Sequence, residues 1–117
     1  MNIRSTRFAL LGPLAAFLLV TRDASALTTD EFFRICEMGE ASCSENPLLN
    51  AYVGGALDLI ASLDEGTDYL QPVYCTDPRT LFKIPAIVEY MEQNRHEYAK
   101  RNAMILLIRY LEENGRC

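Results

Sequence analysis

The sequence has few of the residues from which catalytic and metal sites are usually built. It contains one histidine, His96, and no Cys-x-x-Cys pair, phosphate-binding glycine loop or serine-centred elbow motif. A Cys–His nucleophilic pair needs a free, activated thiol, whereas every cysteine here has a candidate disulfide partner. The missing Cys-x-x-Cys argues against a zinc knuckle and a thioredoxin-type redox motif. We expect no enzyme activity, metal or cofactor, and we interpret His96 as an exposed loop residue.

The acidic residues form neither a paired catalytic site nor a recognisable calcium loop. Glu112 and Glu113 are adjacent, so on a helix their side chains point about 100° apart, which is typical of a solvated helix end. Asp64, Glu65 and Asp68 lie close together, but an EF-hand loop needs alternating oxygen ligands across about 12 residues. We therefore predict a solvated turn at these three residues.

The N-terminal segment is organised like a secretory signal peptide. A basic start precedes an apolar run of 13 residues, and Ala24-Ser25-Ala26 supplies a small-x-small cleavage pattern. A membrane-spanning helix needs about 20 apolar residues, so this run is short for one. The alternative is an uncleaved N-terminal anchor. We expect residues 1–26 to be removed on export to the periplasm, which leaves a single domain of 91 residues, 27–117.

Removal of this segment makes the chain strongly acidic. The sequence has 11 basic and 16 acidic residues, and the first 26 positions hold three of the basic and one of the acidic residues. The mature chain therefore has 8 basic and 15 acidic residues, a net charge of −7. An acidic chain without a basic stripe argues against binding to nucleic acid or to anionic lipid, and it suits a basic protein partner.

The four cysteines lie in the mature chain and indicate two disulfides, as is usual in small exported domains. Four cysteines allow three pairings, and the sequence alone does not choose among them. We prefer the disulfide Cys36–Cys43, which would join the end of one helix to the start of the next. Cys75–Cys117 would then tie the C-terminus to the middle of the chain. Each bridge should stabilise the domain by about 2–4 kcal/mol.

Strand signals are nearly absent, so we predict an all-α fold, a small bundle of four helices stapled by two disulfides. The expected helices are a short one from a Thr28 cap to Gly39, and those over 47–63, 80–94 and 97–114. We expect Gly39 to form a left-handed cap. Ser44 or Asn46 can cap the second helix. Pro85 leaves two alternatives for the third helix, a start near Ile84 or a kink.

The helix over 47–63 has one regular apolar stripe and one side of small residues. The expected inner residues are Leu49, Val53, Ala56, Ile60 and Leu63. The small side carries Gly54 and Gly55, with one charge, Asp58. Two glycines inside a helix cost about 1 kcal/mol each relative to alanine, so they indicate either a close contact or a tolerated defect.

The last helix is apolar on two sides. Ile105 and Ile108 lie well off the stripe that is expected to face the core. Such a helix is either central in the bundle or covered by a second subunit.

Together these features resemble the Rap/Tai family of periplasmic immunity proteins, which accompany the amidase effectors of type VI secretion. The resemblance covers essentially the whole mature chain. The matching features are the signal peptide, the four cysteines, Tyr52-x-x-Gly55-x-x-Asp58 between two of them, and Pro78 after the third. The segment 94–96 lacks the proline usual in the family, and the chain ends in Gly-Arg-Cys rather than aromatic-Pro-Cys.

The resemblance implies a small helical protein, often a homodimer, that binds a peptidoglycan-cleaving amidase and occludes its active-site cleft. It implies a structural role for the motif residues and no catalysis. Contacts with the partner differ between family members, so candidates come from this chain's own loops. They are the acidic loop with Asp64, Glu65 and Asp68, and the polar break with Arg95 and His96. Two other hypotheses are a periplasmic acid-stress chaperone of the HdeA type and an orphan exported binding protein.

Overall fold

A computed structural model of the chain describes residues 26–67 and 72–117, and the expected signal peptide and Asp68 lie outside them. The all-α prediction is confirmed: the described residues form helices, with no β-strand among them. The elements are α1 (Thr29–Glu37), the 3-10 turn η1 (Cys43–Glu45), α2 (Pro47–Gly66), the single turn α3 (Pro78–Leu81), α4 (Ile84–Gln93) and α5 (Met104–Asn114).

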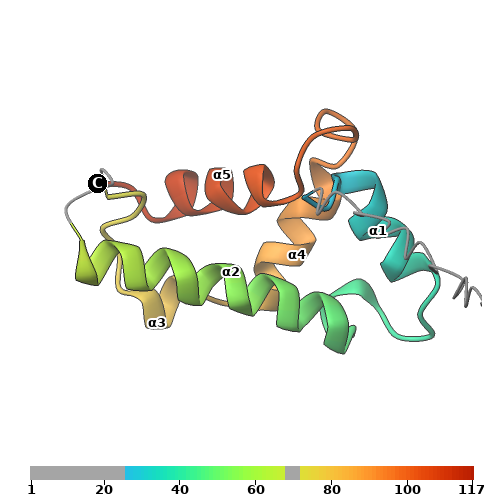
Figure 1. Cartoon of the computed structure of the whole chain (residues 1–117), viewed down its shortest axis with the longest axis horizontal. Coiled ribbons are helices and arrows are strands. Elements are labelled where there is room, and N and C mark those ends of the chain that lie inside the picture. The colour runs from blue at the N-terminus through green and yellow to red at the C-terminus, as the bar shows by residue number, and fades with distance from the viewer. Residues whose placement is uncertain (1–25, 68–71) are drawn as a thin grey trace, which may run out of the picture.

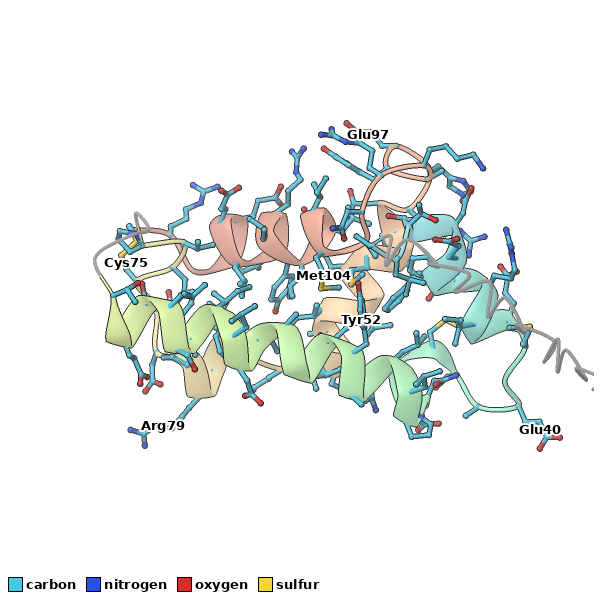
Figure 2. All side chains as sticks on the ribbon, in the orientation of Figure 1. Glu40, Tyr52, Cys75, Arg79, Glu97 and Met104 are labelled. Atoms are coloured by element: carbon cyan, nitrogen blue, oxygen red, sulfur yellow. A yellow bond between two sulfur atoms is a disulfide. The ribbon has the colours of Figure 1, made fainter. Side chains whose placement is uncertain are left out.

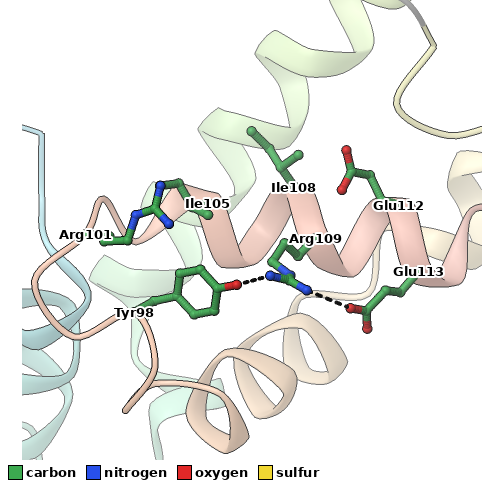
Figure 3. A pocket seen from close by; sticks show the side chains of 7 residues that line it. All are labelled: Tyr98, Arg101, Ile105, Ile108, Arg109, Glu112 and Glu113. Carbon is green, nitrogen blue, oxygen red and sulfur yellow. Dashed lines mark hydrogen bonds and ion pairs between the residues drawn. The ribbon is translucent and has the colours of Figure 1, made fainter.

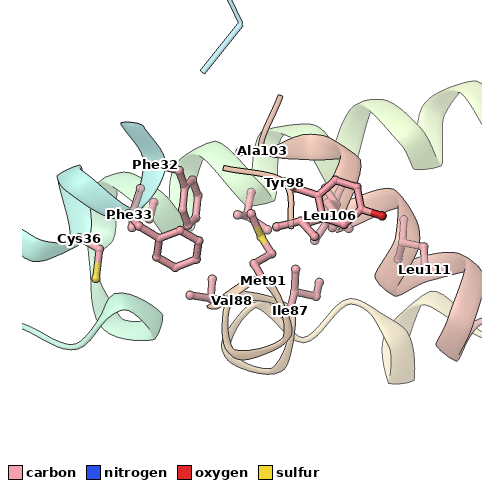
Figure 4. Close-up of a cluster of buried hydrophobic side chains, with 14 of the residues drawn as sticks. Phe32, Phe33, Cys36, Ile87, Val88, Met91, Tyr98, Ala103, Leu106 and Leu111 are labelled. Atoms are coloured by element: carbon pink, nitrogen blue, oxygen red, sulfur yellow. The ribbon is translucent and has the colours of Figure 1, made fainter. Parts of the chain in front are cut away.

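The four longer helices pack around one core (Figure 1). α2 and α5 lie along opposite sides, and α4 crosses between them and contacts both. α1 packs against α2 at the end of the molecule where α2 begins. Phe32 and Phe33 of α1 are buried edge-to-face, with ring centroids 5.0 Å apart. Ile87 and Met91 of α4 meet them at the centre (Figure 4). Burial of one such side chain stabilises the fold by about 1.5–3 kcal/mol.

The helix starts follow local signals in the sequence. Thr28 and Glu31 form the predicted capping box at α1. Asn46 caps α2, and its Oδ1 accepts hydrogen bonds from the N–H groups of residues 48 and 49 at 3.0 and 3.3 Å. α4 begins at Ile84 with Pro85 in its first turn, where proline needs no hydrogen-bond partner. Of the two alternatives for Pro85, the structure has the later start rather than the kink.

The predicted left-handed cap at Gly39 is wrong. α1 ends at Glu37, and Met38 follows in the right-handed region at φ −80°. No described glycine has a positive φ. The N–H of Gly39 donates to the carbonyl of Cys36 at 3.0 Å, so the last turn of α1 tightens instead of reversing hand.

The predicted start of the last helix near residue 97 is also wrong, because α5 begins at Met104. Residues 94–103 form turns whose carbonyls accept hydrogen bonds from the start of the domain. The N–H of Thr29 donates to the carbonyl of Arg101 at 2.9 Å, and the N–H of Asp30 donates to that of Ala99 at 3.0 Å. A helix through 97–103 would use these carbonyls for its own i to i+4 bonds. The long-range pairing therefore prevents the helix from starting earlier.

The preferred disulfide pairing is confirmed. Cys36–Cys43 joins the end of α1 to η1, and Cys75–Cys117 joins the segment before α3 to the C-terminus. Their Cα atoms lie 5.0 and 4.9 Å apart, within the usual range for disulfides. Disulfides persist in oxidising compartments, so the pairing is compatible with an exported protein. In the described part of the chain, no helix has both the length and the apolar character needed to cross a bilayer.

Candidate functional site

Asp64 and Glu65 lie exposed in the last turn of α2 and line a pocket with Cys75. The prediction of a turn at these two residues is therefore wrong, because α2 continues beyond Leu63 to Gly66. They form part of the wall of a pocket of about 440 Å³. The pocket is lined by Asp64, Glu65, Tyr74, Cys75, Thr76, Asp77 and Pro78. The fold therefore places a third carboxylate, that of Asp77, on the wall of the same pocket. The Asp77 carboxylate caps α3 by accepting the N–H of Arg79 at 2.9 Å, and it also pairs with the Arg79 guanidinium at 3.7 Å. The sequence analysis missed Asp77, because its place beside Asp64 and Glu65 depends on how the chain folds back.

The acidic pocket is electrostatically unfavourable for the protein itself. The C-terminal end of a helix carries a partial negative charge, so each carboxylate in the last turn costs about 0.3–1 kcal/mol at low ionic strength. The last turn of α2 has no basic residue to offset Asp64 and Glu65. Among the described residues, Asp64 and Glu65 form no ion pair, whereas Asp77 pairs with Arg79.

Tyr74 forms the buried wall of the acidic pocket. Its ring packs edge-to-face on Phe82, with centroids 5.2 Å apart. Burial raises the pKa of the Tyr74 phenol, and the carboxylates of Asp64 and Glu65 raise it further because they disfavour a second negative charge. The phenol therefore stays neutral at physiological pH, and its hydroxyl remains a hydrogen-bond donor.

The second predicted cluster, Arg95 and His96, lies elsewhere. Figure 2 places Cys75, beside the acidic pocket, at the left end of the structure and Glu97, in the 94–103 loop, at the top of the view, beyond the start of α5. The Arg95 guanidinium pairs with the Glu37 carboxylate at 3.1 Å and lies 5.0 Å from the Phe33 ring centroid. Arg95 therefore fastens the 94–103 loop to α1, and the exposed His96 is the member of this cluster that is open to a partner.

The motif residues Tyr52, Gly55 and Asp58 follow one another along α2. Tyr52 is half-buried, with its ring centroid 6.2 Å from that of Phe32, and burial raises the pKa of its phenol. A Cβ atom at Gly55 would have no atom of the described residues within 4 Å, and the Asp58 side chain is exposed. Within the described part of the chain, Gly55 thus has no close helix contact. Pro78 lies apart from the other three, at the acidic pocket.

The exposed side of α2 is more apolar than the sequence analysis indicated. The buried residues of α2 are Leu49, Val53 and Leu57. The buried face of the helix is therefore centred farther from Leu59 than the sequence analysis predicted. Leu48 and Leu59 are each 61% exposed, and Tyr52 and Gly55 lie between them on the same row. The predicted inner residues Ala56, Ile60 and Leu63 are only partly buried.

All four cysteines are bonded, and His96 stands exposed in a loop. Among the described residues, no group of three or more His, Cys, Asp or Glu side chains is arranged to hold a metal ion. Comparisons of the chain with protein-family models, curated proteins and solved structures found no match. The acidic pocket is the candidate site that the described residues offer.

Proposed function

We propose that this protein is a periplasmic immunity protein, which binds a peptidoglycan amidase effector of type VI secretion and blocks its active-site cleft. Cleavage after Ala26 would release the mature domain into the periplasm, where it would protect the producing cell. The proposal combines the sequence resemblance with the acidic pocket. It assigns the protein binding and inhibition, without catalysis.

The observation that carries the proposal is the acidic pocket formed by Asp64, Glu65 and Asp77. The two acids at the end of α2 reduce the stability of the helix that carries them, as expected for residues retained for binding. They also suit a basic segment at the rim of an amidase cleft. The net charge of the mature chain would attract such a segment over a distance and raise the association rate.

One wall of the acidic pocket, residues 74–78, is joined to the C-terminus by covalent and backbone bonds, and this favours inhibition. The Cys75–Cys117 disulfide closes the loop beside the pocket, and the N–H of Cys75 donates to the carbonyl of Gly115 at 2.7 Å. A loop that is already ordered loses little conformational freedom on binding, so more of the interaction energy appears as affinity.

The test is a titration of purified type VI amidases with the purified protein, followed by release of cleaved peptidoglycan peptides. We expect one amidase of the panel to be inhibited stoichiometrically. In the variant Asp64→Lys/Glu65→Lys the binding should weaken by about 100-fold, because two attractive charges become repulsive. The fold should persist, because lysines in the last turn of α2 are favoured by the helix dipole.

The matched control is Glu40→Lys/Glu45→Lys, which makes the same change in net charge at the opposite end of α2. These glutamates are exposed in and beside η1, so inhibition should be unchanged. If the protein neither binds nor inhibits any amidase of the panel, the proposal is refuted. Suppression of client aggregation in acid but not at neutral pH would then favour the chaperone hypothesis, and inactivity in both assays would favour an orphan binding protein.

A further inference from the structure

The exposed side of α2 carries one continuous row of residues without charge. Leu48, Tyr52, Gly55 and Leu59 follow one another at steps of four, three and four residues, which is the spacing of one helix face. The row is about 16 Å long, or three turns of a helix. Both leucines are mostly exposed and Tyr52 is half-buried. Apolar side chains gathered on one exposed face in this way are typical of a binding surface.

The α2 row begins at an apolar pocket of about 340 Å³ where α1 meets α2. The pocket has no charged residue in its lining, which consists of Ala26, Leu27, Ile35, Leu48, Leu49 and Tyr52. It can hold a large apolar side chain, and such buried anchors carry most of the binding energy at protein interfaces. Farther along the row, a Cβ atom at Gly55 would meet no atom of the described residues within 4 Å. A partner can therefore approach the backbone of α2 closely at this point.

Every charge on α2 is negative. The helix carries Asp58, Asp64 and Glu65, and it has no lysine or arginine. Asp58 is exposed at the edge of the α2 row, three residues after Gly55 and next to Leu59. It forms no ion pair with the described residues. An apolar row with a negative edge is complementary to a helix that is apolar on one side and basic beside it. A second copy of α2 would bring only like charges together.

The pocket of about 490 Å³ beside α5 is a poorer docking site. Its lining includes Ile105 and Ile108, but also charges of both signs that are engaged within the chain. Arg109 donates a hydrogen bond to the Tyr98 hydroxyl and pairs with Glu113 at 3.8 Å (Figure 3). A partner would have to break these contacts, and a lining with both signs does not select the charge of a partner.

We propose that the α2 row is a docking site for a basic amphipathic helix of a protein partner. One large apolar side chain of that helix fills the pocket beside Leu48 and Tyr52. Its next turns lie over Gly55 and Leu59, and a lysine or arginine pairs with Asp58. Contact along three turns makes a small interface, so the affinity is modest. The partner need not be an amidase, and the site is separate from the acidic pocket, so the proposal goes beyond the proposed function.

A nuclear magnetic resonance titration with synthetic peptides tests this proposal, on protein purified after export of the whole chain to an oxidising periplasm. The probe is a peptide of about 15 residues, long enough to form a helix, with phenylalanine and leucine along one side and lysines beside them. We expect the amide signals of residues 48–59 to shift, and the binding to weaken as salt is added. A peptide of the same composition in scrambled order, and one with glutamate in place of lysine, should each bind at least about tenfold more weakly.

Variants of the α2 row separate docking from folding. Leu59→Gln and Asp58→Lys should each weaken peptide binding by about tenfold, through loss of an apolar contact and of an ion pair. Gly55→Gln is the sharpest test, because glutamine favours the helix and should stabilise the domain, while its side chain fills the gap in the row and should weaken binding. The matched controls are Met38→Gln and Glu40→Lys, which make similar changes at exposed positions outside α2 and should bind normally.

Three results would overturn the proposal. The first is the absence of binding to the amphipathic peptide, or equal binding to the scrambled one. The second is binding that Leu59→Gln and Gly55→Gln leave unchanged, or signal shifts confined to the acidic pocket. The third is a shift of the signals of residues 48–59 with protein concentration alone, which would assign the row to a second copy of the chain. No amidase takes part in the titration, so its outcome is independent of the proposed function.

Discussion

Loss of the Cys75–Cys117 disulfide should destabilise the domain more than loss of Cys36–Cys43. The two bridges close loops with sequence separations of 42 and 7 residues. In the chain-entropy model, the longer loop removes more freedom from the unfolded chain. The model gives about 4 kcal/mol for Cys75–Cys117 and about 2.3 kcal/mol for Cys36–Cys43 at 25 °C.

The variants must open each bridge with little damage to packing. Cys75 and Cys117 are exposed, so Cys75→Ser/Cys117→Ser removes that bridge and leaves the core untouched. Cys36 is only 8% exposed, so its sulfur should stay in place, and Cys43→Ser is the better way to open the other bridge. Urea unfolding followed by far-UV circular dichroism, at low protein concentration without reductant, gives the free energy of unfolding of each variant.

The expected result is a loss about 1.5 kcal/mol larger for the 75–117 bridge than for the 36–43 bridge. Reduction of the original protein should cost about the sum of the two losses, which is comparable to the whole stability of many small domains. A larger loss for Cys43→Ser would refute the reasoning. It would mean that contacts at the α1–η1 junction, and not the length of the closed loop, determine what a bridge contributes.

Three further perturbations test other parts of the structure. Gly115→Ala should destabilise by about 1–3 kcal/mol in urea unfolding, because its Cβ would lie 2.7–2.8 Å from three neighbouring atoms, one of them a backbone carbonyl. Gly55→Ala should instead stabilise the domain by about 1 kcal/mol, because a Cβ at position 55 meets open space. Equal changes in the free energy of unfolding for the two variants would contradict this distinction. Asn46→Ala should lower the free energy of unfolding by about 1 kcal/mol through loss of the α2 cap, and an unchanged melting temperature would show that water replaces the cap. Hydrogen bonds to the carboxylates of Asp30 and Glu31 lower their pKa values below the ordinary 3.8 and 4.5. The unfolded chain therefore binds more protons in acid than the folded chain does. The stabilisation from these two carboxylates is complete at pH values above their ordinary pKa, and it is lost as the pH falls through their lowered pKa in the folded protein. The melting temperature should fall over that range, and less steeply in Asp30→Asn/Glu31→Gln, whereas an identical slope would contradict the assignment.

Features set by neighbouring residues were predictable from the sequence. Asn46 before Pro47 is a local helix-start signal, and the cap forms as expected. Pro85 fits the first turn of a helix and breaks its interior, so its position fixed the start of α4 to one of two places. The sequence left three cysteine pairings open, and Cys36–Cys43 was preferred among them because a bridge of short separation needs only a turn between two helices.

Features set by contacts between distant segments were not predictable. The helical pattern over 97–103 is real, but the N–H groups at the start of α1 compete for its carbonyls and prevail. Nothing in the local sequence indicates that these carbonyls will be bound by another segment. The same limit applies to the acidic pocket, because Asp77 joins Asp64 and Glu65 only after the chain folds back through the Cys75–Cys117 disulfide.

The most direct test of the proposed function is survival of cells that export a type VI amidase into their own periplasm. The amidase to use is the one that the purified protein inhibits in the titration. Co-expression of the original protein should prevent lysis, Glu40→Lys/Glu45→Lys should do the same, and Asp64→Lys/Glu65→Lys should fail although it is exported and folded. Lysis with all three proteins would contradict the immunity proposal, and protection by all three would contradict the role assigned to the acidic pocket.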